Sequence, residues 1–302
     1  MLQLLPQVIW YSLLASAIYT LMAIGLTLIF GILGFINFAH GEMAMVSAYL
    51  LLALMVMLKV PFWTAFILVV AVMAVFGVIL EKVTFKRVRR SHPFKPLIIS
   101  IGVSAFLQAL IILVPFFGGG VHSYRQAGDE PAQSFSFFDG NLIITDHQVL
   151  LMGMTVVLLI GLALFLKYAK TGKAVRAVAD NKDVAAILGI NVNRTISVIF
   201  ALSTALAAIA GMLIGGEQNL NPTMGMALGV RAFAAVVLGG VGNVYGAVVG
   251  ALVIGFSENF IVGFMPIPAS FREAIVFSLL ILMLFVKPNG LLGASVEAEV
   301  RK

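Results

Sequence analysis

VLLIGLALFL (157–166) and ISVIFALSTALAAIAGM (196–212) enclose the charged segment RAVADNKDVAAILGINVNR (176–194). The two apolar runs are typical of the chain, in which 61% of the 302 residues are hydrophobic and 11% are charged. Soluble domains carry about 25% charged residues. Because one core cannot hide so much apolar surface from water, lipid must solvate much of this chain.

Further apolar runs of about the length that crosses a bilayer occur along the whole chain. They are continuous rather than alternating, which favours helices over barrel strands. The first run has no basic residue before it, so we expect a retained span and not a cleaved signal. The sequence therefore predicts an all-α integral membrane protein, a polytopic bundle of about eight (8–10) transmembrane helices in a single domain over residues 1–302. The expected spans are 8–30, 43–59, 62–80, 97–117, 149–166, 195–214, 244–262 and 272–286, with a shorter apolar piece at 229–239.

Two segments hold most of the positive charge. Residues 81–95 and residues 167–194 contain six Lys and Arg residues each, whereas the segment 118–148 has one Arg and four acidic residues. The positive-inside rule places 81–95 and 167–194 in the cytoplasm and makes 118–148 an extracytoplasmic loop, with the N-terminus outside. Because the basic residues sit at span ends, they do not indicate nucleic-acid binding.

The side of the C-terminus stays open at this point. Lys287, Arg301 and Lys302 favour the cytoplasm. That placement needs an odd number of crossings, and the parity depends on whether 229–239 belongs to a broken crossing.

Glycine-rich breaks interrupt two apolar segments, at 25–45 and at 229–256. Interrupted hydrophobic segments in corresponding places are typical of a transport path, because irregular backbone at membrane depth must face protein or a water-filled cavity. We therefore expect broken helices near 31–42 and 239–246. Gly242, Gly246 and Gly250 are spaced by four and are expected to pack on one helix face.

Polar residues within these breaks are candidates for the lining of a substrate path. They are Asn37, His40 and Glu42 in FINFAHGEMAM (35–45), and Asn243 in the second break. A short interfacial turn at the headgroups is the alternative for 35–45. His40 and Glu42 point to opposite sides of a helix, so no shared metal site is expected. Arg231 and Glu258 are expected to extend to a membrane interface.

Motifs for catalysis and nucleotide binding are absent from the sequence. The chain has no cysteine, no phosphate-binding G-x-x-x-x-G-K-[ST] loop and no G-x-S-x-G or H-E-x-x-H motif. We expect no enzyme activity and no cofactor or metal in this chain. Uphill transport would then draw on an ion gradient or on a partner ATPase.

The segment 176–194 predicts a short cytoplasmic helix over 183–188. Asn181 or Asp180 can cap its start, and Gly189 can end it in a left-handed conformation. A short helix with small and apolar residues suits a groove on another protein. The alternative is a helix that lies on lipid headgroups.

This segment resembles the cytoplasmic coupling loop of bacterial ABC-importer permeases for branched-chain amino acids. GLTLIFGILGFINFAHGEMAMVSAYL (25–50), AFAAVVLGGVGNVYGAVVGALVIG (232–255) and FVKPNGLLG (285–293) resemble other segments of that family. The matches cover nearly the whole chain. They are less specific for the solute, so an importer of urea or short amides is one alternative, and an ion-coupled secondary transporter is another.

The resemblance implies a permease subunit in the bacterial inner membrane. It would pair with a second homologous permease and with two cytoplasmic ATPase subunits, which bind ATP and Mg. A periplasmic binding protein would deliver Leu, Ile or Val. The residues expected to couple to the ATPase are Ala179, Asp180, Asp183, Ala185, Ala186, Leu188, Gly189, Ile190 and Asn191.

Overall fold

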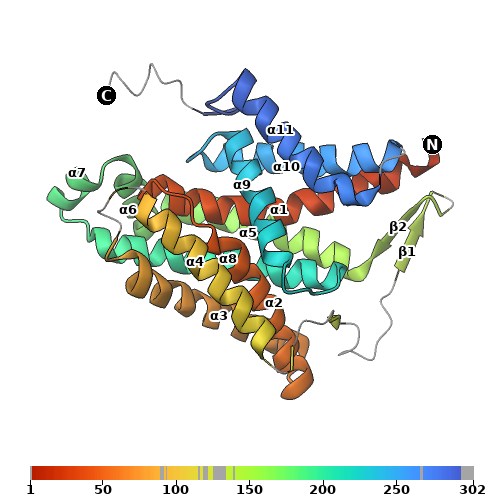
Figure 1. Cartoon of the computed structure of the whole chain (residues 1–302), viewed down its shortest axis with the longest axis horizontal. Coiled ribbons are helices and arrows are strands. Elements are labelled where there is room, and N and C mark those ends of the chain that lie inside the picture. The colour runs from red at the N-terminus through yellow and green to blue at the C-terminus, as the bar shows by residue number, and fades with distance from the viewer. Residues whose placement is uncertain are drawn as a thin grey trace.

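The computed structural model describes residues 2–88, 92, 94–114, 116–117, 122–124, 134–138, 140–265 and 268–293. These residues form a helical bundle with one small β-hairpin (Figure 1). The helices are α1 (Leu5–Leu33), α2 (Ala39–Met57), α3 (Phe62–Leu80), α4 (Phe94–Leu113), α5 (Asp146–Tyr168), α6 (Lys170–Asp180), α7 (Lys182–Ile187), α8 (Val192–Glu217), α9 (Met224–Gly239), α10 (Val244–Phe264) and α11 (Arg272–Val286), and the strands are β1 (Ser134–Phe137) and β2 (Leu142–Thr145).

The fold is that of an all-α polytopic membrane protein, as predicted. Seven helices in the described part of the chain are long and apolar enough to cross a membrane: α1, α2, α3, α4, α5, α8 and α10. The helix α3 is extended by a π-helical turn, Glu81–Phe85. The helices α9 and α11 are also apolar but have only 16 and 15 residues.

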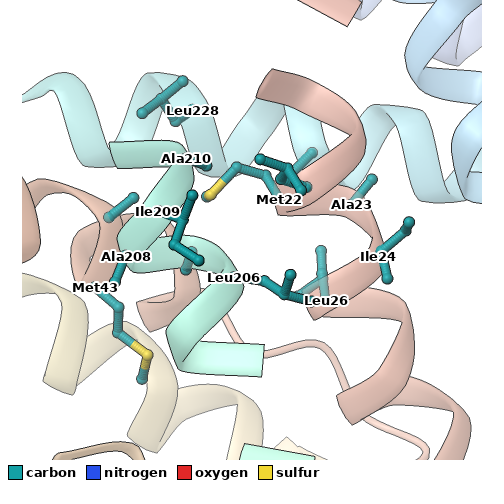
Figure 2. Packing of buried hydrophobic residues seen from close by; sticks show 14 of the residues in the cluster. Met22, Ala23, Ile24, Leu26, Met43, Leu206, Ala208, Ile209, Ala210 and Leu228 are labelled. Atoms are coloured by element: carbon teal, nitrogen blue, oxygen red, sulfur yellow. The ribbon is translucent and has the colours of Figure 1, made fainter. Parts of the chain in front are cut away.

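The helix α1 forms the centre of the bundle. It contacts α5, α8, α9 and α10, and most of its side chains are buried on all sides. A helix that is apolar all round is expected in such a position. Figure 2 shows Met22 and Leu26 of α1 among side chains of α8 and α9, including Ile209 and Leu228, with Met43 of α2 close by.

Both predicted breaks interrupt the helices. Residues 34–38 separate α1 from α2, and residues 240–243 separate α9 from α10. Gly34 and Gly240 end their helices with φ of 73° and 111°, where a side chain would be strained. Gly242 also has positive φ and precedes α10, so it does not share the helix face of Gly246 and Gly250, contrary to the prediction.

The contacts of the C-terminal segment place it at one end of the bundle. The amide of Leu291 donates to the carbonyl of Leu238 over 2.8 Å, and the Asn243 side chain donates to the carbonyl of Leu292. Asn243 borders the same cavity as Lys167 and Arg176 of the basic segment. Residues 287–293 therefore lie at the same end of the bundle as the basic segment. Arg301 and Lys302 lie outside the described residues.

The opposite end holds the β-hairpin and the start of α1 (Figure 1). Ser134 pairs with Thr145, and the amide of Ile143 donates to the side chain of Gln7. The predicted loop 118–148 is therefore partly ordered, and it ends at Thr145 because Thr145 and Gln148 form a capping box that starts α5. Residues 118–121, 125–133 and 139 of this loop lie outside the described residues.

Candidate functional site

Three polar side chains at the first break lie inside the bundle. Asn37, His40 and Glu42 are each about 1% exposed. Asn37 precedes α2, and its side-chain oxygen accepts from the amide of Ala39. These side chains lie within protein and do not form a turn among headgroups.

His40 and Glu42 point to different neighbours, as the spacing predicted. His40 Nε2 lies 3.1 Å from the carbonyl oxygen of Met22, and Nδ1 lies 3.5 Å from Ser203 Oγ. A Cβ atom on Gly25 would approach the His40 ring to 2.8 Å, so glycine makes room for the ring. Within the described residues, no three His, Asp or Glu side chains gather where they could hold a metal ion.

Glu42 points into a cavity of about 250 Å³ between the first break, α4 and α9. Its Oε1 accepts from Ser104 Oγ of α4 over 3.2 Å. Its Oε2 and the Nδ2 of Asn37 are buried and have no hydrogen-bond partner among the described residues. The remaining wall of the cavity is mostly apolar, and it includes Phe38, Ile101, Met226 and Phe233, together with the polar Gln108.

Asn37 and Glu42 thus border a mostly apolar cavity, and each has one buried polar atom without a partner among the described residues. Buried polar groups normally have partners, so this cavity is a candidate site for a polar ligand. The sequence indicated Asn37 and Glu42, but not Ser104, Gln108 or Phe233. Those side chains come from helices far away in the sequence, and no local signal marks them.

Asn243 has a different role from the other three. Its Oδ1 caps α10 by accepting from the amides of Tyr245 and Gly246, over 3.0 and 3.2 Å. It lies on the rim of a second, larger cavity, together with Lys167 and Arg176 of the basic segment. The structure therefore does not bring Asn243 together with Asn37, His40 and Glu42.

The basic segment 167–194 forms two short helices, α6 and α7, rather than the single one predicted. The first, α6, turns Val175 and Val178 inward and packs against α5 and α8. The second, α7, starts at the cap of Asn181, whose Oδ1 accepts from the amides of Asp183 and Val184, each over 3.0 Å. Gly189 follows the helix with φ of 83°.

The tip of α7 exposes large apolar side chains. Ile187 is 83% exposed and Leu188 is 74% exposed, and Val184 is half exposed. Ala185 is buried, so it anchors α7 on the bundle. Ala179, Asp180, Asp183, Ala186 and Gly189 are exposed, Ile190 is half-buried, and Asn191 caps α8 by accepting from the amide of Arg194. Val184 and Ile187 belong to the apolar residues of this helix in the sequence but were not among the expected coupling residues, although both are at least half exposed.

Arg231 and Glu258 form a buried ion pair, whereas the sequence suggested that each reaches an interface. Arg231 Nη2 lies 3.0 Å from Glu258 Oε1, and the other carboxylate oxygen accepts from the hydroxyl of Tyr19 over 2.9 Å. The pair joins α9 to α10, and Tyr19 adds α1. An unpaired charge is costly at membrane depth, so mutual pairing explains why both residues are tolerated there.

Comparison with known proteins identifies relatives along nearly the whole chain. The family model described as branched-chain amino acid transport system / permease component matches residues 8–284. The high-affinity branched-chain amino acid transport system permease protein BraD of Pseudomonas aeruginosa is 35% identical over 96% of this chain and 95% of its own. LivH of Escherichia coli K12, which carries the same description, is 34% identical over 94% and 93%.

A solved structure shares the fold. It is described as PsaBC from Streptococcus pneumoniae in complex with Fab, and it aligns with a TM-score of 0.53 and 14% identity. The alignment covers 92% of this chain and 91% of that chain.

Proposed function

The chain belongs to the family of branched-chain amino acid transport system permeases, and we propose that it is the permease subunit of an ATP-driven importer that forms the path for leucine, isoleucine and valine. The observation that carries this proposal is the match to such permeases over about 95% of the chain. The broken helices and the cavity at the first break give the match a physical basis.

The cavity has chemistry that suits an aliphatic amino acid. Glu42 and Asn37 border the cavity, where a carboxylate can pair with the substrate ammonium group and a side-chain amide can donate to the substrate carboxylate. The apolar wall around Phe38 and Phe233 can receive the branched side chain. Urea and short amides carry no ammonium group and no branched chain, so they would leave Glu42 and the apolar wall without partners.

The exposed tip of α7 supports docking of an ATPase subunit. The cap at Asn181 and the turn at Gly189 fix the helix at both ends. A force applied to α7 would therefore move the whole helix as one unit. Val184, Ile187 and Leu188 offer apolar contacts that suit a groove on a partner. In this proposal the partner subunits bind ATP and Mg and hydrolyse ATP, and this chain does no catalysis.

The remaining parts of the proposed assembly follow from the orientation. A periplasmic binding protein delivers the amino acid on the side of the β-hairpin, and a second homologous permease completes the path. The assembly lies in the bacterial inner membrane, with α6 and α7 in the cytoplasm.

The proposal is tested by reconstituting this chain in liposomes with its partner subunits and the binding protein. We expect ATP-dependent uptake of radiolabelled leucine, and Glu42→Gln should reduce it at least tenfold because the ammonium group loses its counter-charge. Gln108→Ala is the matched control, because Gln108 borders the same cavity but carries no charge. This variant should lose much less leucine uptake than Glu42→Gln. Uptake of leucine by this chain alone under an ion gradient, or preferential uptake of urea, would overturn the proposal.

A further inference from the structure

A cavity larger than the one beside Glu42 is separate from the proposed substrate site. It has a volume of about 960 Å³ and lies between α5 and α10, which both pack on α1. Its floor is the α1 surface from Ile24 to Ile32, and its sides include Leu159 and Leu162 of α5 and Val248 of α10. None of Asn37, His40 or Glu42 borders it.

The deeper part of the cavity is lined by apolar side chains, and its mouth at the cytoplasmic end is lined by basic ones. Lys167 and Arg176 stand at that mouth, and both are exposed. Tyr168 and Tyr245 flank it and are 63% and 76% exposed. Exposed tyrosines at one level of a membrane protein mark the headgroup region, so the two cations lie where lipid phosphates lie.

The length of the apolar part matches one leaflet. From Ile24 to Ile32 the floor extends about 12 Å at the ordinary rise of an α-helix. Half of the hydrocarbon core of a bilayer is about 15 Å thick. Leu164 in the wall is 51% exposed, so the cavity opens at the outer surface of the bundle.

The α1 floor presents little polar surface to the cavity. Thr27 borders the cavity but is 1% exposed, and its hydroxyl is buried, so this hydroxyl is not open to a ligand there.

From these observations we propose that the cavity between α5 and α10 is a binding site for an anionic phospholipid of the cytoplasmic leaflet. Its phosphate pairs with Lys167 and Arg176, and one acyl chain lies along α1 toward Ile24. Basic pockets between transmembrane helices on the cytoplasmic side bind such headgroups. A free branched-chain amino acid fits poorly, because the cavity has nearly four times the volume of the one beside Glu42.

A bound lipid in this position would connect α5, α6 and α10. Its headgroup contacts the end of α5 and the start of the cytoplasmic segment, and its chain contacts the helix that follows the second break. The lipid would thereby stabilise the packing of the coupling segment against the core, and its presence can be measured without any transport assay.

The test is native mass spectrometry of the full chain, purified with the subunits that accompany it, with added phosphatidylglycerol or phosphatidylcholine. We expect selective retention of phosphatidylglycerol. Lys167→Gln combined with Arg176→Gln should weaken the affinity for phosphatidylglycerol about 25-fold, because each basic residue near anionic lipid contributes roughly a factor of five to the affinity. The matched control is Lys170→Gln combined with Lys173→Gln, which removes two exposed charges of α6 that do not border the cavity. That control should bind as the original chain does.

A second variant probes the apolar part without changing charge. Ala163 borders the cavity and is exposed, so Ala163→Trp fills the space without disturbing the core, and it should displace the lipid. Equal retention of both lipids, equal loss in both charge variants, or full retention in Ala163→Trp would overturn the proposal. Displacement by excess leucine would identify a substrate site instead, and displacement by inorganic phosphate alone would identify a simple anion site.

Discussion

At the scale of single residues, the buried ion pair of Arg231 and Glu258 ties three helices together. Arg231 contacts Glu258 through Nε and Nη2, and Nη1 donates to the carbonyl of Ala227 on its own helix. Tyr19 of α1 donates to the same carboxylate. Each charged atom thus has a partner within the protein, which offsets the cost of removing both charges from water.

Glu258→Ala should strongly destabilise the chain, because it leaves the Arg231 guanidinium buried without a counter-charge. Loss of one partner of a buried pair costs about 3–5 kcal/mol. Unfolding of the detergent-solubilised chain, followed by circular dichroism, measures the effect. Arg231→Met combined with Glu258→Leu should recover most of the stability, since no charge remains. If the double variant loses as much stability as the two single variants, Arg231→Met and Glu258→Leu, lose together, the two residues do not act as a pair.

The sequence could not show this pair because its members stand 27 residues apart on different helices. Each residue alone matches the pattern of a side chain that extends to an interface. Asn181 was different: its partners are the amides two and three residues further on, so the cap could be predicted from local sequence. Residue roles that depend on neighbours in the chain were predictable, and those that depend on tertiary packing were not.

At the scale of elements, α2 and α9 approach each other at glycine. A Cβ atom on Gly41 would collide with the backbone of Gly225 and would lie 2.9 Å from Gly229 Cα. Small residues allow such close helix crossings in membranes. The crossing places Glu42 beside α9, so it also shapes the candidate substrate cavity.

Gly41→Ala should therefore destabilise the bundle by about 1–3 kcal/mol, the usual cost of overpacking a core. Gly102→Ala on α4 is the control, because a Cβ atom there meets no atom within 4 Å. The thermal unfolding midpoint of each purified variant gives the comparison. An unchanged midpoint for Gly41→Ala would mean that the two helices do not cross as closely as described here.

The helix α7 supports a second prediction at this scale. Ala186 is exposed beside a groove of about 400 Å³ that includes Asp183 and Ile190. Ala186→Trp should keep normal levels in the membrane but reduce ATP-dependent leucine uptake at least tenfold, because the bulky ring prevents docking. Ala186→Ser changes the size little and should transport normally. Cross-linking from Leu188 to lipid alone, with uptake intact, would contradict a docking role for α7.

Hydrophobic patterns in the sequence predicted the long helices but not the short helix α6. The long apolar runs predicted the spanning helices, since length and hydropathy suffice for that. The helix α6 was missed because its apolar positions, Val175 and Val178, are few and its other residues resemble a solvated loop. Its stability comes from packing on α5 and α8, which local sequence does not contain.

At the scale of the whole molecule, the distribution of charge and the contacts of the chain ends agree on one orientation. The basic segment, the second break and residues 287–293 share one end of the bundle, and the β-hairpin and the start of α1 share the other. Charge alone left the C-terminal side open. The contact of Leu291 with Leu238 places residues 287–293 at the same end of the bundle as the basic segment, so we predict that both lie on one side of the membrane.

Cysteine labelling can test this orientation directly, because the chain has no cysteine of its own. Ile187→Cys and Lys287→Cys introduce thiols at exposed positions of the cytoplasmic end, and Phe137→Cys introduces one in β1 at the opposite end. In right-side-out membrane vesicles, an impermeant maleimide should label only Phe137→Cys. After permeabilisation it should label all three. Labelling of Lys287→Cys in sealed vesicles would place the C-terminal segment outside, and α9 would then not be a crossing. Because Asn243 borders the cavity of Lys167 and Arg176 and donates to Leu292, the same result would either place that cavity rim outside as well or contradict these contacts, so it would also bear on where lipid phosphate can bind.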